Sequence, residues 1–466
     1  MVASCARGAM LLLLAHARIH HASAQLSVPM QRMIPREYDV LTGENNTLLK
    51  LFTLPSMPTY MGVAPKEQKE SNDVLADMTW YISSVTGMVQ LHPLVPLQYV
   101  YLQQHNGVVG GIWKRHHDLF ARLIASLKPR HVVEIGGGHG YLAMKLLFSD
   151  AVSAWTMIDP NPLGLFSMPS LTVIKLFIED VTVLPPTVDI VVHSHTLEHI
   201  YDPNAFFRKL RQVMPLHSHH VFSMPNLFEL ARAGAPCLHF EHTMMLSEGW
   251  VDWLLSRHGF QIVSKTPFGG RHSIFYVSKL VSKGEGPIGR VSDPPNYFRE
   301  ARMIARRWHD DLMADAAAAA AQLSSDRSLN FLYAAHVGSQ LLLAAGLPAS
   351  SFACVLDNNF EKVDARLYGT SLWVRAPAAI AGLRSPRVVL RQGSYNREIA
   401  EQLRRINPSV IIIEPRRAAD KSFGAEWNRT SPTVATSRSH TRGRDKQDRS
   451  LFASARDLIM GRSSRL

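Results

Sequence analysis

The sequence predicts an α/β protein whose main part is a Rossmann-like domain with a doubly wound parallel sheet. Helical and strand patterns alternate through residues 110–280, which is typical of parallel strands joined by helical crossovers. Within this stretch, an apolar strand at 132–135 leads directly into a glycine-rich turn and then a helix. A second, shorter alternation follows at 329–414, so we expect a second C-terminal α/β domain.

The elements of both α/β units follow from their apolar periodicity. The first helix is predicted at 113–128, where apolar residues recur at the three- and four-residue spacing of an amphipathic helix. The other elements of the first unit are helices at 141–149 and 205–214 and strands at 155–159, 188–194, 219–225 and 272–280. The second unit is predicted to contain strands at 330–335, 352–357, 387–391 and 409–414, and helices at 340–345 and 397–405.

Changes in composition along the sequence predict how the chain divides into domains. Its 466 residues are too many for one hydrophobic core. Short apolar runs between turn residues indicate a small β-rich module near the N-terminus, and an Ala-rich run favours a helical connector between the α/β units. The predicted segments are a targeting or disordered stretch at 1–36, the β-rich module at 37–109, the first α/β domain at 110–280, the connector at 281–328, the second α/β domain at 329–414 and a disordered basic tail at 415–466.

Charge and cysteine content narrow the partners and the compartment. The formal net charge is +12, but much of it lies in the tail, where aromatic residues do not interleave the arginines, so we expect no nucleic-acid partner. Three distant cysteines supply neither a disulfide framework nor a zinc cluster. No apolar run is long enough for a membrane span. We therefore predict a cytoplasmic protein and keep organelle targeting by residues 1–36 open, because that stretch has no acidic residue.

The glycine-rich turn carries the strongest chemical signal. Gly136, Gly138 and Gly140 follow the strand that contains Glu134, and Asp159 ends the next strand. Glycines let the backbone turn sharply and approach a ligand at the carboxyl end of the strand. A carboxylate such as Asp159 can accept hydrogen bonds from ribose hydroxyls. These residues predict a nucleotide-type ligand.

The order of acid and glycines, E-x-G-x-G-x-G, resembles the fingerprint of class I methyltransferases that use S-adenosylmethionine. The resemblance places Glu134 near the methionine end of the cofactor, Asp159 at the ribose, and Glu179 and Asp180 at the adenine. It also places His195 in the loop that borders the methyl-transfer pocket, beside the cofactor. We therefore expect S-adenosylmethionine as cofactor and a small molecule as substrate.

Three further stretches resemble the sugar-nucleotide C-methyltransferases, which methylate a ring carbon beside a ketone. The segment CLHFEHTMMLS resembles the family's Y-H-E-H-x-S motif, with Glu241 and His242 as its E-H pair. The runs GMVQLHPLVPLQYVYL and CVLDNNFEKVDARLYGTSLWV resemble the end of its N-terminal module and its second Rossmann-like domain. The resemblance covers roughly residues 37–414 and implies a sugar nucleotide or related keto metabolite as substrate.

The chain departs from this family at its N-terminal module. The family holds zinc there with two C-x-x-C pairs, but the matching positions are Tyr38, Leu41, Ser83 and Thr86. Zinc cannot bind to these side chains. We therefore expect apolar packing to hold the module together, or a less stable module.

Methylation of a carbon beside a carbonyl needs a base and a group that stabilises the developing oxyanion. His242 fits the base, since an imidazole pKa near 6.5 suits proton removal at neutral pH. Glu241 would orient the imidazole, and Tyr99 or Tyr101 would donate a hydrogen bond to the oxyanion. Glu241 and His242 are the residues that match the E-H pair, and Tyr99 and Tyr101 lie in the run that resembles the end of the family's N-terminal module.

Two other readings of the chain stay open. One is an O- or N-methyltransferase in which the histidine-rich loop at 193–199, with His195, supplies the base. The other is a non-catalytic relative that serves as a binding or assembly protein. The spacing of His193, His195 and His199 also suggests a metal site, but without a second ligand cluster of comparable quality we expect no metal.

Overall fold

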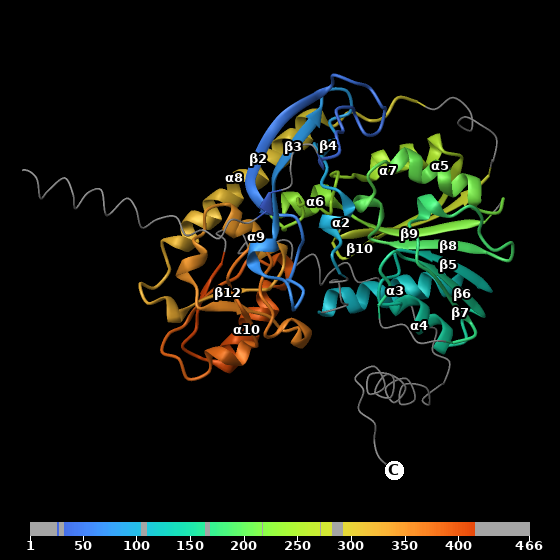
Figure 1. The fold of residues 1–466 in the computed structure, drawn as a ribbon. Helices are drawn as coiled ribbons and strands as arrows, with labels where there is room; N and C mark the ends of the chain where they lie inside the picture. Colours follow the sequence, from blue (N-terminus) through green and yellow to red (C-terminus); the bar gives the residue numbers. More distant parts are fainter. Residues whose placement is uncertain are drawn as a thin grey trace, which may run out of the picture.

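The computed structural model describes residues 26–27, 32–103, 110–163, 168–216, 218–270, 272–281 and 292–414. The basic tail at 415–466 and most of the predicted targeting segment lie outside these residues. Within the described part of the chain, no helix is long and apolar enough to cross a membrane. Figure 1 shows three bodies: N-terminal strands in blue, a central domain in green and a C-terminal domain in orange and red.

The central domain is a seven-stranded sheet in the order β10-β11-β9-β8-β5-β6-β7, which confirms the predicted α/β class. The five strands β7, β6, β5, β8 and β9 are parallel. The strands are β5 (His131–Ile135), β6 (Ala154–Ile158), β7 (Leu171–Ile174), β8 (Ile190–Ser194), β9 (His219–Pro225), β10 (Phe260–Phe268) and β11 (Ser273–Leu280).

The prediction of a parallel sheet was wrong at one edge. β11 runs antiparallel to β9, and β10 runs antiparallel to β11. The two strands form a hairpin whose connection contains Gly269 and Gly270, both with positive φ, and so short a connection joins only antiparallel strands. β10 was not predicted because most of its residues face solvent and give no apolar alternation.

Helices cover both faces of this sheet (Figure 1). Side chains of β5 alternate between the faces: Val132 packs in one apolar cluster with Phe120, and Val133 packs in another with Phe206. The helices on the first face are α3 (Gly111–Ser126) and α4 (Tyr141–Phe148), and those on the second are α5 (Pro203–Val213) and α7 (Glu248–Arg257), with α6 (Leu227–Arg232) toward the C-terminal domain. The predicted helices at 113–128, 141–149 and 205–214 are confirmed.

The N-terminal module is a small, mostly antiparallel sheet against a long helix, with β1 parallel to its neighbour. β2 (Leu48–Pro58) pairs with β3 (Val74–Ser83), which also pairs with β4 (Val89–Leu91) and with β1 (Leu26–Ser27). The predicted connector is the helix α8 (Phe298–Ala320), which runs along β2 and β3 in Figure 1. Its Trp308 lies 6.2 Å from Phe52 between ring centroids. A short helix, α2 (Leu97–Val100), leads from the module toward the central domain.

Two turns of this module, residues 38–42 and 83–87, contain the positions where the resembling family has its cysteines. We call them the paired turns. A buried hydrogen-bond network joins them: Thr86 Oγ1 donates to Asp39 Oδ2 at 2.5 Å, and the backbone N–H groups of Leu41 and Thr42 donate to Asp39 Oδ1. Ser83 Oγ accepts from the Thr86 N–H at 3.3 Å. The expectation of apolar packing alone was therefore incomplete, because polar side chains also hold these turns.

The C-terminal domain is a five-stranded parallel sheet in the order β14-β13-β12-β15-β16. Its strands are β12 (Asn330–Tyr333), β13 (Cys354–Leu356), β14 (Val374–Arg375), β15 (Arg387–Val389) and β16 (Ile411–Ile413), with helices α9 (Val337–Ala344) and α10 (Asn396–Ile406). A buried ion pair ties this domain to the N-terminal module, since Arg366 Nη2 donates to Asp73 Oδ1 at 2.9 Å.

Candidate active site

The glycine turn lies at the carboxyl end of β5. Gly136, Gly138 and Gly140 all have positive φ, a backbone conformation that only glycine adopts at little cost. Space is also restricted there: a Cβ on Gly137 would lie 2.8 Å from Glu134 Oε2, and one on Gly136 would lie 3.0 Å from Thr196 Oγ1. The turn is thus a stretch of backbone without side chains, which a bound nucleoside can approach closely. We call this turn the cradle.

Asp159 holds the cradle from the end of β6. Its Oδ2 accepts a hydrogen bond from the Gly138 N–H at 2.8 Å, and its Oδ1 accepts one from the Asn161 N–H at 2.7 Å. The residue is only 5% exposed. A carboxylate offers about four acceptor positions, so two remain for ribose hydroxyls. The residues present therefore fit S-adenosylmethionine at this end of the sheet.

Glu134 lies beneath the turn on β5. It is buried, and its Oε2 accepts a hydrogen bond from Trp155 Nε1 at 3.0 Å. Burial raises the pKa of this carboxyl group to about 8. The hydrogen bond from Trp155 lowers the pKa and so offsets part of this effect. The group is therefore largely protonated at neutral pH and can donate as well as accept a hydrogen bond.

Glu179 and Asp180 follow β7 on a short 3-10 helix, Ile178–Asp180. Ile178 is buried and anchors this helix, while both acidic side chains are exposed. They follow the strand that lies next to the strand of Asp159, because β6 pairs with β7. Their assignment to the adenine stays a prediction.

A second group of side chains gathers where β8 ends. It consists of Tyr101, Glu198, His199, Glu241 and His242, and we call it the site cluster. His199 is central: its Nδ1 lies 2.9 Å from Tyr101 Oη and 3.7 Å from Glu241 Oε2, and its Nε2 lies 3.8 Å from Glu198 Oε1. The His199 and His242 rings meet edge to face at 5.1 Å. Residues far apart in the sequence thus converge on one imidazole.

The segment with Glu241 and His242 is fixed between β4 and the turn after β8. The Met245 N–H donates to Val89 O at 2.8 Å, and the Thr243 N–H donates to Glu198 O at 2.9 Å. Arg36, fully buried, clamps the same place by donating to Leu91 O and Thr243 O. The N-terminal module therefore positions half of the site cluster.

His242 has a defined tautomer. Its Nδ1 lies 2.7 Å from Cys237 O, and because a carbonyl can only accept, Nδ1 carries the proton and Nε2 keeps its lone pair. Burial lowers the pKa of this imidazole to about 3, while the Glu241 carboxyl raises it. His242 is therefore neutral at physiological pH and Nε2 keeps its lone pair, but burial places its pKa well below the value near 6.5 that was expected for the base.

Glu198 is the most unusual member of the site cluster. It is completely buried, and neither carboxyl oxygen has a hydrogen-bond partner. Burial raises its pKa to about 8. Such a group costs free energy unless something pairs with it. Sequence reasoning placed Glu198 in the loop but gave it no role, although its position next to His199 was the available signal.

The hydroxyl groups of the two candidate tyrosines lie at different places and have different partners. Tyr101 Oη lies beside His199, and burial raises its pKa well above the usual value. Tyr99 points elsewhere, because its hydroxyl accepts a hydrogen bond from Arg32 Nη1 at 3.0 Å. The structure thus brings Tyr101 and not Tyr99 to the site cluster.

His195 occupies a strained position between the glycine turn and the site cluster. Its φ is +51°, its Nε2 lies 3.0 Å from Ser273 Oγ, and its Nδ1 lies 3.5 Å from Glu198 Oε1. The Trp113 ring meets it edge to face at 4.6 Å. Burial lowers the pKa of His195 well below its usual value, so this ring is also neutral.

The spacing of His193, His195 and His199 does not build a metal site. His193 is fully buried under the sheet, where its Nε2 lies 2.9 Å from His220 Nε2. It belongs to the core and contacts neither of the other two. The three imidazoles therefore do not converge.

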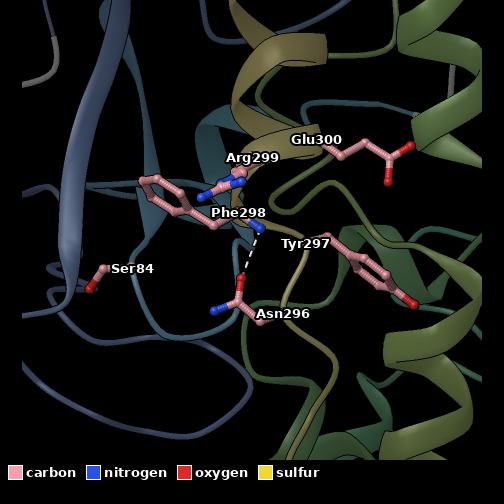
Figure 2. Close-up of a pocket in the computed structure, with 6 residues that line it drawn as sticks. All are labelled: Ser84, Asn296, Tyr297, Phe298, Arg299 and Glu300. Atoms are coloured by element: carbon pink, nitrogen blue, oxygen red, sulfur yellow. Dashed lines mark hydrogen bonds between the residues drawn. The ribbon is translucent and has the colours of Figure 1, made fainter.

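A separate surface hollow lies at the start of α8, remote in the chain from the site residues. Figure 2 shows Asn296 and Phe298 there, joined by a hydrogen bond from the Phe298 N–H to Asn296 Oδ1. No residue of the glycine turn or the site cluster lines this hollow, which is formed by Ser84, Asn296, Tyr297, Phe298, Arg299 and Glu300. We do not assign it a role in the chemistry.

Comparison with known proteins gives one family match. Residues 112–265 match a family model described as a methyltransferase domain. No curated protein matches the sequence. Similar solved structures include an S-adenosylmethionine-dependent methyltransferase from Mesorhizobium loti, with 14% identity, a TM-score of 0.30 and coverage of 37% of this chain and 100% of that one.

A second similar structure is the N-methyltransferase NodS from Bradyrhizobium japonicum WM9, at 16% identity and a TM-score of 0.29, covering 36% of this chain and 96% of that one. The assignment rests on the family model together with the doubly wound sheet and the glycine turn. These findings identify residues 112–265 as a methyltransferase domain.

Proposed function

We propose that the enzyme methylates a carbon beside a carbonyl group in a small molecule, with keto-deoxysugar nucleotides as the first substrate class to test. The observation that carries this proposal is the orientation of His242, whose Nε2 lone pair is free of the Cys237 contact and lies in a partly exposed ring. A base, an acidic partner and a phenol in one place suit enolate chemistry.

Each residue has a distinct part in this proposal. His242 Nε2 accepts the proton from the substrate carbon, and Glu241 favours the protonated ring. Tyr101, hydrogen-bonded to His199, donates to the substrate oxygen as charge develops on it. When bound, S-adenosylmethionine supplies the methyl group, and its sulfur keeps the electrons of the broken bond. The electron pair released by proton removal forms the new carbon–carbon bond.

The cofactor end is assigned to the glycine turn. Asp159 would hold the ribose with its remaining acceptor positions, and Gly136, Gly138 and Gly140 would let the backbone approach the cofactor. Glu134, protonated at neutral pH, would lie toward the methionine end. Glu179 and Asp180 would meet the adenine.

A second candidate is O- or N-methylation with His195 as base. The contact of His195 Nδ1 with Glu198 at 3.5 Å favours it, because the carboxyl group would stabilise a protonated ring. This candidate predicts that His242 is dispensable, whereas the first predicts that it is not.

The test begins with calorimetric titration of S-adenosylmethionine into wild type, Asp159→Ala and the exposed control Asp310→Ala. We expect binding that is lost only in Asp159→Ala. Wild type would then be incubated with keto-deoxysugar nucleotides, and products would be detected by mass spectrometry. His242→Ala should lower kcat by at least about 100-fold without changing cofactor affinity.

The outcomes separate the candidates. Full activity of His242→Ala with loss of activity in His195→Ala would overturn the first candidate in favour of the second. Failure of the wild type to bind S-adenosylmethionine would overturn both.

A further inference from the structure

We infer that Glu198, His199 and His242 form a binding site for one divalent cation of the zinc class. The three residues each offer a ligand atom, and these atoms all lie within 4.8 Å of one another. From the sequence we expected no metal. The inference uses a different set from the histidine spacing considered there, since Glu198 and His242 take the places of His193 and His195.

The buried carboxyl group of Glu198 is the first argument. Both of its oxygens are buried without a hydrogen bond, and the contacts with His195 and His199, at 3.5 and 3.8 Å, are long. Buried carboxylates in proteins are paired, hydrogen-bonded or bound to a metal. A cation between Glu198 and the two imidazoles would supply the missing partner.

The orientation of the imidazoles is the second argument. Histidines that bind a metal through one nitrogen usually donate the other N–H to a carbonyl or carboxyl group. His242 donates Nδ1–H to Cys237 O, which leaves Nε2 as the ligand atom. His199 Nδ1 lies near Tyr101 Oη and Glu241 Oε2, which leaves Nε2 on the side of Glu198. In both rings, one nitrogen has a protein partner and the other is positioned to bind a metal, as is usual for histidine ligands.

The ligand set selects the class of cation. Two imidazole nitrogens and one carboxylate oxygen match the three protein ligands of catalytic zinc sites, which keep a fourth position open. Magnesium and calcium prefer oxygen ligands and fit less well. Zinc bonds of about 2.0 Å bring ligand atoms to roughly 3.3 Å from one another. The present separations, at most 4.8 Å, therefore need to close by up to about 1.5 Å, within the reach of side-chain rotation.

A bound cation would change the roles of these residues in methyl transfer. Because His242 Nε2 would then be a ligand, it could not also take the substrate proton. The metal-bound site and the site with His242 as base are therefore alternative states of these residues. The binding site itself does not depend on which substrate the enzyme uses.

The experiment measures metal binding directly. Untagged full-length protein is stripped with a chelator and titrated with Zn²⁺ against a competing dye and with Co²⁺ by visible absorption. We expect one equivalent to bind, with the intense absorption of a low-coordinate cobalt site. Glu198→Gln and His242→Gln should each weaken binding by at least about 10-fold and reduce the cobalt absorption.

Matched controls separate this site from the other histidines of the chain. His131→Gln and Glu248→Gln change the same residue types elsewhere, where His131 contacts Thr187 and Glu248 pairs with Lys265. Both should bind metal as the wild type does. Thermal unfolding and calorimetric binding of S-adenosylmethionine check that every variant is folded.

Two results would overturn the inference: absence of a stoichiometric site in the wild type, or unchanged affinity in both Glu198→Gln and His242→Gln. The second would place the metal at other histidines. A protein that binds S-adenosylmethionine and methylates a keto substrate but has no stoichiometric metal site keeps the proposed function and loses this inference. One that binds metal at this site but methylates no keto substrate keeps the site and loses the proposed function.

Discussion

The paired turns, within the N-terminal module, and the site cluster, beside it, are both buried polar groups, but their hydrogen bonds are satisfied to different degrees. In the paired turns, the Asp39 carboxyl group accepts three hydrogen bonds. In the site cluster, the Glu198 carboxyl accepts none and has only long contacts with two imidazoles. A fully satisfied network stabilises a fold, whereas an unsatisfied one is kept at a cost. The difference indicates which group serves structure and which serves chemistry.

The largest effect on stability is expected at Asp39. Asp39→Ala would leave two backbone N–H groups and the Thr86 hydroxyl without their acceptor, at a cost of about 4 kcal/mol in the free energy of unfolding. Urea denaturation would measure it. Affinity for S-adenosylmethionine should not change, because Asp39 does not touch the glycine turn.

Asp77→Ala is the matched control, since Asp77 lies in the same module and accepts one exposed hydrogen bond from Ser56. It should cost less than about 1 kcal/mol. Equal effects of the two substitutions would contradict a structural role for the paired turns.

Glu134 allows a test by pH, because it is a buried carboxyl group with one hydrogen bond. Its pKa rises from 4.5 in the unfolded chain to about 8 in the folded protein. Its stabilising contribution is therefore complete below pH 4.5 and is lost as pH rises toward 8. From about pH 5 to about pH 7 the wild type should lose about 3 kcal/mol relative to Glu134→Gln. Denaturation of both proteins without cofactor measures this gap, and a gap independent of pH would show that Glu134 is ionised when folded.

The smallest expected effect is an increase in stability, whereas Asp39→Ala lowers it. In metal-free protein at about pH 7, Glu198→Gln should increase the free energy of unfolding by about 1 kcal/mol, because it removes a buried ionisable group that has no hydrogen bond. Glu248→Gln, on the surface, should change it by less than about 0.5 kcal/mol. If Glu198→Gln destabilised the protein, Glu198 would stabilise the fold as Asp39 does, and the difference between the site cluster and the paired turns would not hold.

Much of the fold could be predicted from the sequence because local signals agree with it. The strand at 132–135, the glycine turn and the helix at 141–149 each follow from neighbouring residues, and the structure contains all three. β10 escaped prediction because Phe260–Phe268 is mostly exposed. Its direction depends on a hairpin, which apolar periodicity does not report.

The candidate site was predictable only in part. His242 and Glu241 were found by resemblance, and Asp159 by its place after a strand. The choice between Tyr99 and Tyr101 depends on which hydroxyl meets Arg32 and which meets His199, and these partners lie 67 and 98 residues away. Glu198 stands out only because its surroundings leave it without a hydrogen bond, which requires the packed structure.

The buried arginines also bear on how the chain is made. Arg36 meets Thr243 across 207 residues, and Asp73 meets Arg366 across 293. The N-terminal module leaves the ribosome first, yet its partners emerge only after most of the chain has been synthesised. Contacts of such long range form slowly. Until then, the surfaces of the module that contact these partners stay exposed. A chain truncated before Arg366 would contain the complete methyltransferase domain, but its N-terminal module would lack the ion pair with the C-terminal domain.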